Sequence, residues 1–240
     1  MNRIDNLKIK LFADGADFDG MVAMRKNPLI KGFTTNPTLM RKAGVTDYEA
    51  FARSVLAKIT DLPVSFEVFA DDFDMMERQA RVIATWGSNV NVKIPVMNTE
   101  GVFTGPVISS LSRDNIPLNV TAIMTVQQVA DVAEALSPDA AAIISVFAGR
   151  VADTAVDPMP HMRACRKAIA SRPRAQLLWA SPRELLNIFQ ADEVGCDIIT
   201  ATNDILAKLQ IVGKDLTDYS RETVQMFYHD AKASGFSISI

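Results

Sequence analysis

The chain has 240 residues, of which 48% are hydrophobic, and carries 25 basic and 28 acidic side chains for a formal net charge of -3. This length and apolar content fit a single domain with a sizeable core. The charge balance offers no basic field for nucleic acid or an anionic membrane, so we expect a small-molecule substrate. The N-terminus lacks a signal-peptide pattern and no apolar run reaches about 18 residues, which predicts a cytoplasmic protein with no membrane partner.

The sequence contains few residues that could bind a metal ion or a cofactor. Cys165 and Cys196 are too few for a disulfide framework or a thiolate cage, and we expect both to be buried and unreactive. His161 and His229 lie far apart in the sequence, and only His161 stands near a cysteine, Cys165, which alone makes too small a ligand set. Neither G-x-G-x-x-G nor a P-loop motif occurs, so we predict no metal and no cofactor.

Short β-branched or apolar runs alternate with segments of helical periodicity along the chain. Examples of the helical segments are Tyr48–Ile59 and Met75–Ile83. The runs predicted as strands are Ile9–Asp14, Gly32–Asn36, Val64–Phe69, Asn89–Ile94, Pro117–Thr121, Ala141–Phe147, Ala175–Ser181 and Cys196–Thr200. Eight such units predict an α/β fold, a (β/α)8 TIM barrel closed by right-handed crossovers.

An additional C-terminal helix is expected beyond the eighth unit. We predict one domain over residues 1–240, with 214–240 as a helical extension, because no linker or low-complexity tract interrupts the alternation. Asp218 is the expected N-cap and Gly235 the expected end. The apolar stripe of Val224, Phe227 and Tyr228 is typical of a helix that packs on the barrel or on a second subunit, and both interpretations remain open.

Polar residues follow one parity in the predicted strands. Asn91 and Lys93 alternate with apolar neighbours, as Ser65 and Glu67 do in the preceding strand. Helices cover the outside of a barrel, so we expect the polar side chains to point inward. Nearly every predicted strand ends in such a group, and the carboxyl ends of barrel strands carry the active site. Taken singly, a strand-end Asn, Ser or Thr is explained by capping or backbone hydrogen bonds.

Lys93 is the residue that most needs a functional explanation. A lysine inside an apolar strand is rarely buried unless it is paired. One interpretation is a structural ion pair with Glu67 or Asp14. The other is that burial and neighbouring cations favour an uncharged amine that attacks a carbonyl.

Two arginines follow the sixth and seventh predicted strands. Arg150 and Arg183 are positioned to hold a phosphate group by forked hydrogen bonds, helped by a helix expected to begin near Pro182. Solvated loop arginines are the ordinary alternative.

Five motifs together resemble the transaldolase family, in order and over nearly the whole chain. They are GFTTNPTL at 32–39, NVKIP at 91–95, NVT at 119–121, ISVFAGR at 144–150 and ASPR at 180–183. By length the chain is similar to the short branch of the family, which includes fructose-6-phosphate aldolases. The resemblance implies a class I enzyme that works through a lysine Schiff base.

The resemblance also implies a role for individual residues. Lys93 would form the Schiff base, Asp14 would act as acid and base, and Glu67 with Thr121 would hold the catalytic water. The substrate-binding residues implied are Asn36, Asn119 and Ser145 for the dihydroxyacetone part, and Arg150, Ser181 and Arg183 for the phosphate.

Phe147 and Glu67 match the transaldolase pattern, whereas fructose-6-phosphate aldolases resemble Tyr and Gln at these positions. An apolar Phe cannot deliver a proton to the enamine, which favours transfer of the three-carbon unit over its release. Val146, where the family usually carries Pro, and Gly15–Asp17 depart from the pattern beside the predicted site and leave substrate preference open.

We therefore predict a transaldolase of carbohydrate metabolism, in the pentose phosphate pathway or a specialised sugar route. It would transfer a dihydroxyacetone unit between sugar phosphates. The alternatives are a fructose-6-phosphate aldolase-like lyase and a non-catalytic sugar-phosphate-binding barrel. The resemblance implies a homo-oligomer, a pentamer or decamer, in which the terminal helix reaches a neighbouring subunit.

Overall fold

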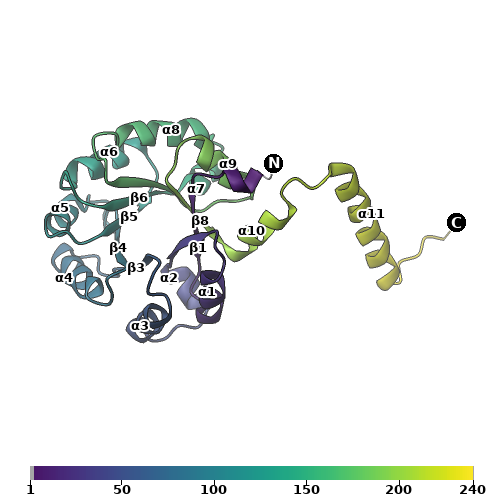
Figure 1. The fold of residues 1–240 in the computed structure, drawn as a ribbon, viewed down its shortest axis with the longest axis horizontal. Coiled ribbons are helices and arrows are strands. Elements are labelled where there is room, and N and C mark those ends of the chain that lie inside the picture. Colours follow the sequence, from purple (N-terminus) through teal and green to yellow (C-terminus); the bar gives the residue numbers. More distant parts are fainter. Residues whose placement is uncertain (1–2, 240) are drawn as a thin grey trace. The chain divides into compact units, whose positions relative to one another are not determined.

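The computed structural model describes residues 3–239 of the chain (Figure 1). Their contacts divide into two compact units, which are described separately. The first is Leu7–Ala207. The second consists of the described parts of segments 1–6 and 208–240.

Eight parallel strands of the first unit form a closed barrel in chain order, with β8 pairing back to β1. The strands are β1 Lys10–Asp14, β2 Ile30–Thr34, β3 Val64–Glu67, β4 Val90–Pro95, β5 Leu118–Ile123, β6 Ala142–Val146, β7 Ala175–Trp179 and β8 Ile198–Thr202. Each overlaps one predicted run, which confirms the (β/α)8 barrel. The largest offsets are in β2 and β8. Strand β2 ends early because Asn36 already caps the following helix.

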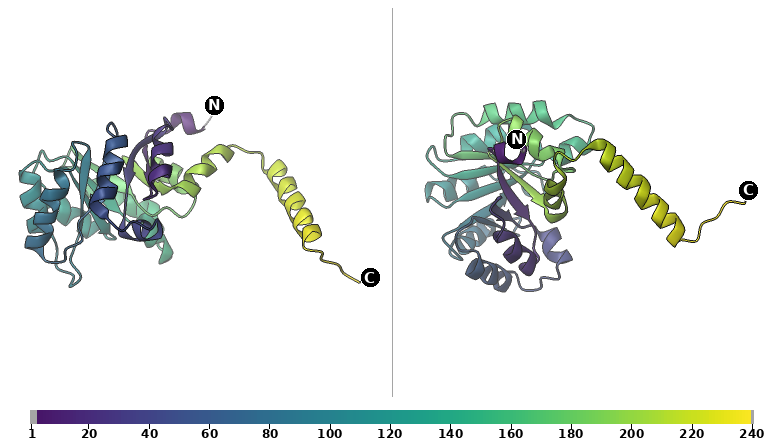
Figure 2. Two further views of the ribbon diagram at one scale, coloured as in Figure 1. Left: turned by 90° about the horizontal axis from the view of Figure 1, so that it is seen from below. Right: turned by 45° about the vertical axis from the view of Figure 1, so that its right-hand side comes forward.

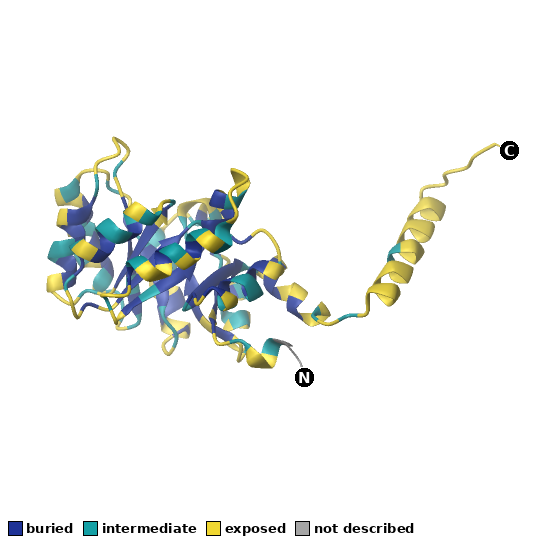
Figure 3. Ribbon diagram, turned by 90° about the horizontal axis from the view of Figure 1, so that it is seen from above, coloured by how far each residue is buried: buried dark blue, intermediate teal, exposed yellow. Residues whose placement is uncertain are grey.

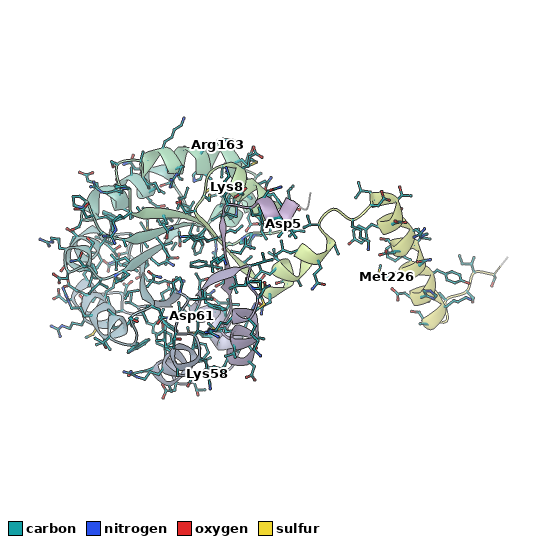
Figure 4. All side chains as sticks on the ribbon, in the orientation of Figure 1. Asp5, Lys8, Lys58, Asp61, Arg163 and Met226 are labelled. Atoms are coloured by element: carbon teal, nitrogen blue, oxygen red, sulfur yellow. The ribbon has the colours of Figure 1, made fainter. Side chains whose placement is uncertain are left out.

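Helices surround the barrel on its outside, as Figures 1 and 2 show from three directions. They are α1 Phe18–Arg25, α2 Pro37–Lys42, α3 Tyr48–Lys58, α4 Phe73–Ala84, α5 Gly105–Arg113, α6 Val126–Ala135, α7 Ala148–Asp153, α8 Pro158–Ala168, α9 Leu186–Glu193 and α10 Asn203–Ala207. Aspartates cap several of their N-termini, and the carboxylate of Asp72, for example, accepts from the N–H of Met75. Surface ion pairs join neighbours, such as Arg163 of α8 and Glu193 of α9 at 2.8 Å (Figure 4).

The strands are the most deeply buried part of the barrel (Figure 3). Their outward faces pack under the helices, and Val92 and Ile94 of β4 are fully buried. Inside the barrel, an apolar layer forms around Phe12, Leu178 and Ile198. The ring of Phe12 lies so close to Gly32 that a Cβ there would sit 2.5 Å from its Cζ, so only glycine fits. This apolar layer supports the polar residues at the carboxyl ends of the strands.

Both cysteines are buried in the first unit, as predicted from the sequence. Burial raises the pKa of the Cys165 thiol to about 11. Burial, together with the nearby Asp197 carboxylate, also raises the pKa of Cys196. Both thiols are therefore protonated near neutral pH, and a thiol is a much weaker nucleophile than a thiolate.

The second unit contains the 3₁₀ turns η1 Arg3–Asn6 and η2 Lys208–Ile211 and the helix α11 Leu216–Ala233. The N-cap of α11 is Asp215 rather than the predicted Asp218, because Asp215 Oδ1 accepts from the N–H groups of Thr217 and Asp218. Gly235 ends the helix as predicted, at φ 67°, with its N–H bonded to Lys232. The single-domain prediction for 1–240 stays a prediction.

No residue of α11 is buried. Its apolar side chains include Val224, Met226 and Phe227, which are 64%, 51% and 62% exposed (Figure 4 labels Met226). Among residues 3–239, no helix has the length and apolar character needed to span a bilayer.

Candidate active site

A cavity of about 600 Å³ opens at the carboxyl ends of the barrel strands. All eleven side chains predicted from the sequence line it: Asp14, Asn36, Glu67, Lys93, Asn119, Thr121, Ser145, Phe147, Arg150, Ser181 and Arg183. They come from segments spread over about 170 residues of sequence. The barrel topology alone brings them together.

Lys93 is 6% exposed and lies inside the barrel at the base of this group. Its Nζ donates to the carbonyl oxygen of Thr35 at 2.8 Å and lies 2.9 Å from Oε2 of Glu67. The ion pair considered from the sequence is therefore present. The prediction of cations beside the Lys93 amine is wrong for the groups bonded to it. These are the Glu67 carboxylate and the Thr35 carbonyl.

The carbonyl of Thr35 is available to Lys93 because the pairing of β2 with β3 breaks at this point. The amide of Thr35 bonds to the carbonyl of Ser65 at 3.3 Å, as a parallel ladder requires. Continuing that ladder would direct the Glu67 N–H to the Thr35 carbonyl. Instead the Glu67 N–H donates to the hydroxyl of Tyr48 at 2.7 Å. The β2–β3 ladder therefore lacks one backbone hydrogen bond, and the Thr35 carbonyl accepts from Lys93 Nζ instead.

Asp14 ends β1 and faces the same cavity. Its Oδ1 accepts from Thr34 Oγ1 at 2.8 Å, and its Oδ2 accepts a longer bond of 3.4 Å from Asn36 Nδ2. Burial raises the pKa of Asp14, and this effect outweighs the lowering by the Lys93 charge and by the two hydrogen bonds. A carboxyl group with a raised pKa is suited to exchange protons with a substrate.

The hydroxyl oxygen of Thr34 lies 2.5 Å from the hydroxyl oxygen of Thr200 on β8. Since the one proton of Thr34 is donated to Asp14, Thr200 must be the donor in this contact. Thr200 thus donates to Thr34, and Thr34 donates to Asp14, so the two threonines together hold the Asp14 carboxylate in position. Neither was assigned a role from the sequence, where a threonine in a strand fits ordinary β propensity.

The amide side chain of Asn36 makes two hydrogen bonds, one through its oxygen and one through its nitrogen. Its Oδ1 accepts from the N–H of Leu39 at 3.0 Å and so caps α2. This fixes the amide orientation and directs Nδ2 toward Asp14. The capping interpretation is thus confirmed for Asn36, and its substrate-binding role stays a prediction.

Buried polar groups continue from β3 to β6. Asn119 Nδ2 donates to Ser65 Oγ at 3.1 Å, and Ser145 Oγ donates to Asn119 Oδ1 at 2.6 Å. All three residues are at most 3% exposed. Thr121, on β5 at the same face as Asn119, is also buried and lines the cavity. This chain of bonds orients the amide and hydroxyl groups without any charge.

Phe147 and Arg150 lie next to each other at the start of α7. The guanidinium of Arg150 lies 5.4 Å from the centre of the Phe147 ring, a cation–π distance. Ser181 adopts a φ of 57° after β7, and its carbonyl oxygen lies against Gly149. A Cβ at Gly149 would be 1.6 Å from that oxygen, so glycine is required where the two loops meet.

Arg183 lines the cavity but is paired with Asp153, which its Nε approaches to 3.0 Å. The helix predicted to begin near Pro182 begins at Leu186 instead. The N–H groups of Arg183 and Glu184 bond to Oδ1 of Asn187 at 2.7 and 3.2 Å. These amides are therefore occupied within the loop, and the expected help from a helix N-terminus at Pro182 is wrong.

The model of the family described as Transaldolase/Fructose-6-phosphate aldolase matches residues 11–238. The chain belongs to this family. The family, inferred from five motifs in the sequence, is thereby confirmed, and the two departures from its pattern can be placed. Val146 is fully buried in β6, and Gly15–Asp17 line a smaller, adjoining pocket, so neither is among the residues that line the 600 Å³ cavity.

Proteins similar in sequence to this chain align with it over almost their whole length. The chain is 34% identical over 231 residues to a "Probable transaldolase" of Hyphomonas neptunium, covering 96% of this chain and 100% of the relative. It is 33% identical to a "Probable transaldolase" of Dehalococcoides mccartyi, covering 88% and 93%. Among solved structures, the carboxyl transferase domain of Rhizobium etli pyruvate carboxylase has a TM-score of 0.60 at 12% identity, over 88% of this chain and 44% of that one, and shows the barrel fold alone.

Proposed function

We propose that this family member is a transaldolase that moves a dihydroxyacetone unit from a ketose phosphate to an aldose phosphate, with Lys93 as the covalent nucleophile and no cofactor. The observation that carries the proposal is the position of the Lys93 amine. It is buried, it ends in a cavity large enough for a sugar phosphate, and a carboxylate lies 2.9 Å away.

Glu67 is the group suited to prepare the amine. Only an uncharged amine attacks a carbonyl, and the Glu67 carboxylate is close enough to take the proton from Nζ. The free amine then adds to the C2 carbonyl of the ketose to give a carbinolamine. Loss of water from the carbinolamine gives an iminium ion, and we assign Glu67 and Thr121 to hold that water.

Asp14 is the proton acceptor in the bond-breaking step. The iminium ion withdraws electrons, so the C3–C4 bond breaks as Asp14 takes the proton of the C4 hydroxyl. The electron pair of that bond moves into the enamine, and the aldose leaves. An acceptor aldehyde then reverses the step and recovers the proton from Asp14. Burial raises the pKa of Asp14 and brings it closer to a value useful for both directions.

The remaining residues are assigned to substrate binding. Asn36, Asn119 and Ser145 offer amide and hydroxyl groups to the dihydroxyacetone part. Arg150 and Arg183, with Ser181, offer donors for the phosphate. Phe147 contributes an apolar wall, which leaves the enamine without a nearby proton donor until the acceptor arrives.

Borohydride trapping tests the covalent step. The protein is incubated with fructose 6-phosphate, reduced, digested and read by mass spectrometry. We expect the reduced adduct on Lys93 and none in Lys93→Ala, with Lys58→Ala as a control on an exposed lysine. An adduct that survives Lys93→Ala would eliminate Lys93 as the nucleophile. No adduct in the unaltered protein would eliminate the covalent mechanism and favour a non-catalytic binding barrel.

The alternative activity is an aldolase that releases free dihydroxyacetone. It is distinguished by assaying release with and without an acceptor such as erythrose 4-phosphate. Rapid release in the absence of acceptor would replace the transferase proposal. We further propose a cytoplasmic homo-oligomer, for which the resemblance to the short branch of the family implies a pentamer or decamer. The apolar stripe that α11 exposes, which includes Val224 and Phe227, supports a subunit contact there.

A further inference from the structure

A second cavity, of about 420 Å³, lies at the opposite end of the barrel, where the strands begin. The interior of a small barrel is normally filled by packed side chains. Here the layer of inward-facing side chains at the beginning of the strands is largely polar, and it leaves this cavity unfilled. Its polar lining is Lys10, Lys31, Asn91, Arg174 and Gln176.

The charge of this lining has a single sign. Lys10, Lys31 and Arg174 line the cavity, and none of its described lining residues carries a carboxylate. Lys31 Nζ donates to the carbonyl of Pro28 at 2.7 Å and Arg174 Nη1 donates to the carbonyl of Asp139 at 2.8 Å, both neutral acceptors. Over residues 3–239, none of the three cations forms an ion pair. In a chain with more acidic than basic residues, these three exposed cations share one cavity, and its described lining holds no compensating anion.

Two amide side chains face the same space. Asn91 precedes Lys93 by two residues on β4, and Gln176 precedes Leu178 of the inner apolar layer by two on β7, so both share the inward parity. Neither amide side chain has a hydrogen-bond partner within the described chain. They are partly buried, and they add uncharged donors beside the three cations.

Phe12 closes this cavity on its inner side. Its ring lines the cavity and belongs to the apolar layer that includes Ile143 and Leu178. The cavity is therefore distinct from the one that contains Lys93, which shares no lining residue with it.

We propose that this cavity, the N-terminal cavity, binds a phosphate group, either inorganic phosphate or a phosphomonoester. Arg174 supplies a planar fork suited to two phosphate oxygens, while Lys10 and Lys31 supply point charges on flexible stems. Asn91 and Gln176 supply neutral donors to the remaining oxygens. A bound phosphate would neutralise the like charges and so stabilise the folded chain.

Calorimetric titration with inorganic phosphate at constant ionic strength tests the site. Because Arg150 and Arg183 offer donors in the proposed active site, the titration is run in an Arg150→Gln/Arg183→Gln background. We expect one saturable site in this background. Adding Lys10→Gln, Lys31→Gln and Arg174→Gln should weaken it at least tenfold, whereas adding Arg53→Gln, on the barrel surface, should not.

Thermal melting gives a second readout. Phosphate should raise the melting temperature of the background variant, but not that of the variant that also lacks the three cations. A melt without phosphate checks that each variant folds. No saturable phosphate binding in the background, binding unchanged by the three substitutions, or binding of citrate in preference to phosphate would each overturn the proposal. None of these results depends on Lys93 chemistry.

Discussion

The hydroxyl group of Tyr48 donates to the carbonyl oxygen of Glu67 at 2.9 Å and accepts from the N–H of the same residue at 2.7 Å. One side-chain hydroxyl thus satisfies both backbone groups at the end of β3, where β2 no longer pairs. The Tyr48 ring is held by contacts with Phe66, Phe69 and Trp86 at centroid distances of 6.1, 4.6 and 5.4 Å. Burial raises the pKa of this hydroxyl, which keeps its proton available for donation.

Replacing Tyr48 by Phe should impair both stability and turnover. Loss of the hydroxyl leaves the Glu67 N–H without its acceptor, at a cost of about 1–3 kcal/mol in unfolding free energy. The Glu67 carboxylate then loses its fixed position beside Lys93, so we expect kcat to fall by about 10- to 100-fold. Denaturant titration and steady-state kinetics measure the two effects.

Tyr219→Phe is the matched control, because it removes the hydroxyl of an exposed tyrosine in α11. Its stability and kcat should remain those of the unaltered chain. If Tyr48→Phe destabilises the protein but leaves kcat and the pH profile unchanged, Tyr48 is structural only and does not position Glu67.

The sequence was sufficient to predict the eight strands and eleven of the side chains that line the cavity. Helices cover the outside of the barrel, so polar parity within a strand identifies the inward face, as it did for Lys93. It did not reveal Tyr48, because a tyrosine in the apolar stripe of a helix has the pattern of a core residue. The start of α9 was misplaced for a related reason: the Asn187 side chain binds the N–H groups after Pro182, and such a local loop contact leaves no periodic signal.

Asp14→Asn should separate catalysis from stability. The amide cannot take the proton of the C4 hydroxyl, so kcat should fall by about 10²- to 10⁴-fold. Burial raises the pKa of Asp14 above its usual 3.8, which means that the folded state binds this proton more tightly than the unfolded state does. The contribution of Asp14 to stability is therefore full below pH 3.8 and is lost as the pH rises through the folded pKa.

Thermal melts between acidic and neutral pH test this sign. Relative to the unaltered chain, Asp14→Asn should gain stability as the pH rises. Asp61→Asn should show the opposite trend, because a hydrogen bond from Arg25 lowers the pKa of Asp61. A difference between Asp14→Asn and the unaltered chain that does not vary with pH would refute the assignment of a raised pKa.

Phe147→Tyr should shift the reaction from transfer toward release. A phenol at this position places a proton donor in the wall of the cavity, where the enamine forms in the proposed mechanism. We expect the ratio of acceptor-independent release of dihydroxyacetone to transfer to rise at least tenfold, measured by coupled assays on the same preparation. Phe69→Tyr, at a 53% exposed site outside the cavity, should leave the ratio unchanged. An unchanged ratio in Phe147→Tyr would remove Phe147 as the determinant.

The oligomer proposal is tested on α11. We expect a chain that ends at Gly213 to form particles with fewer subunits than the full chain does, with the number of subunits taken as the molar mass from light scattering divided by the mass of one chain. Phe227→Glu should have the same effect, since it places a charge in the apolar stripe. Gln225→Glu adds the same charge at another exposed α11 position and should not change the mass. An unchanged number of subunits after truncation would exclude α11 as a subunit contact.

Arg183 must exchange partners if it is to bind the substrate phosphate. In the structure its guanidinium is paired with Asp153, and the side chains are 49% and 52% exposed. Arg183→Gln should raise the KM for a phosphorylated donor by about 10- to 100-fold, the effect of losing a charge-assisted hydrogen bond, with little change in kcat. Asp153→Asn should lower that KM, because it removes the competing carboxylate. Arg163→Gln breaks a comparably exposed pair with Glu193 away from the cavity and should leave KM unchanged. If Arg183→Gln raises KM equally for dihydroxyacetone donors that lack a phosphate, the residue shapes the cavity and does not recognise the phosphate.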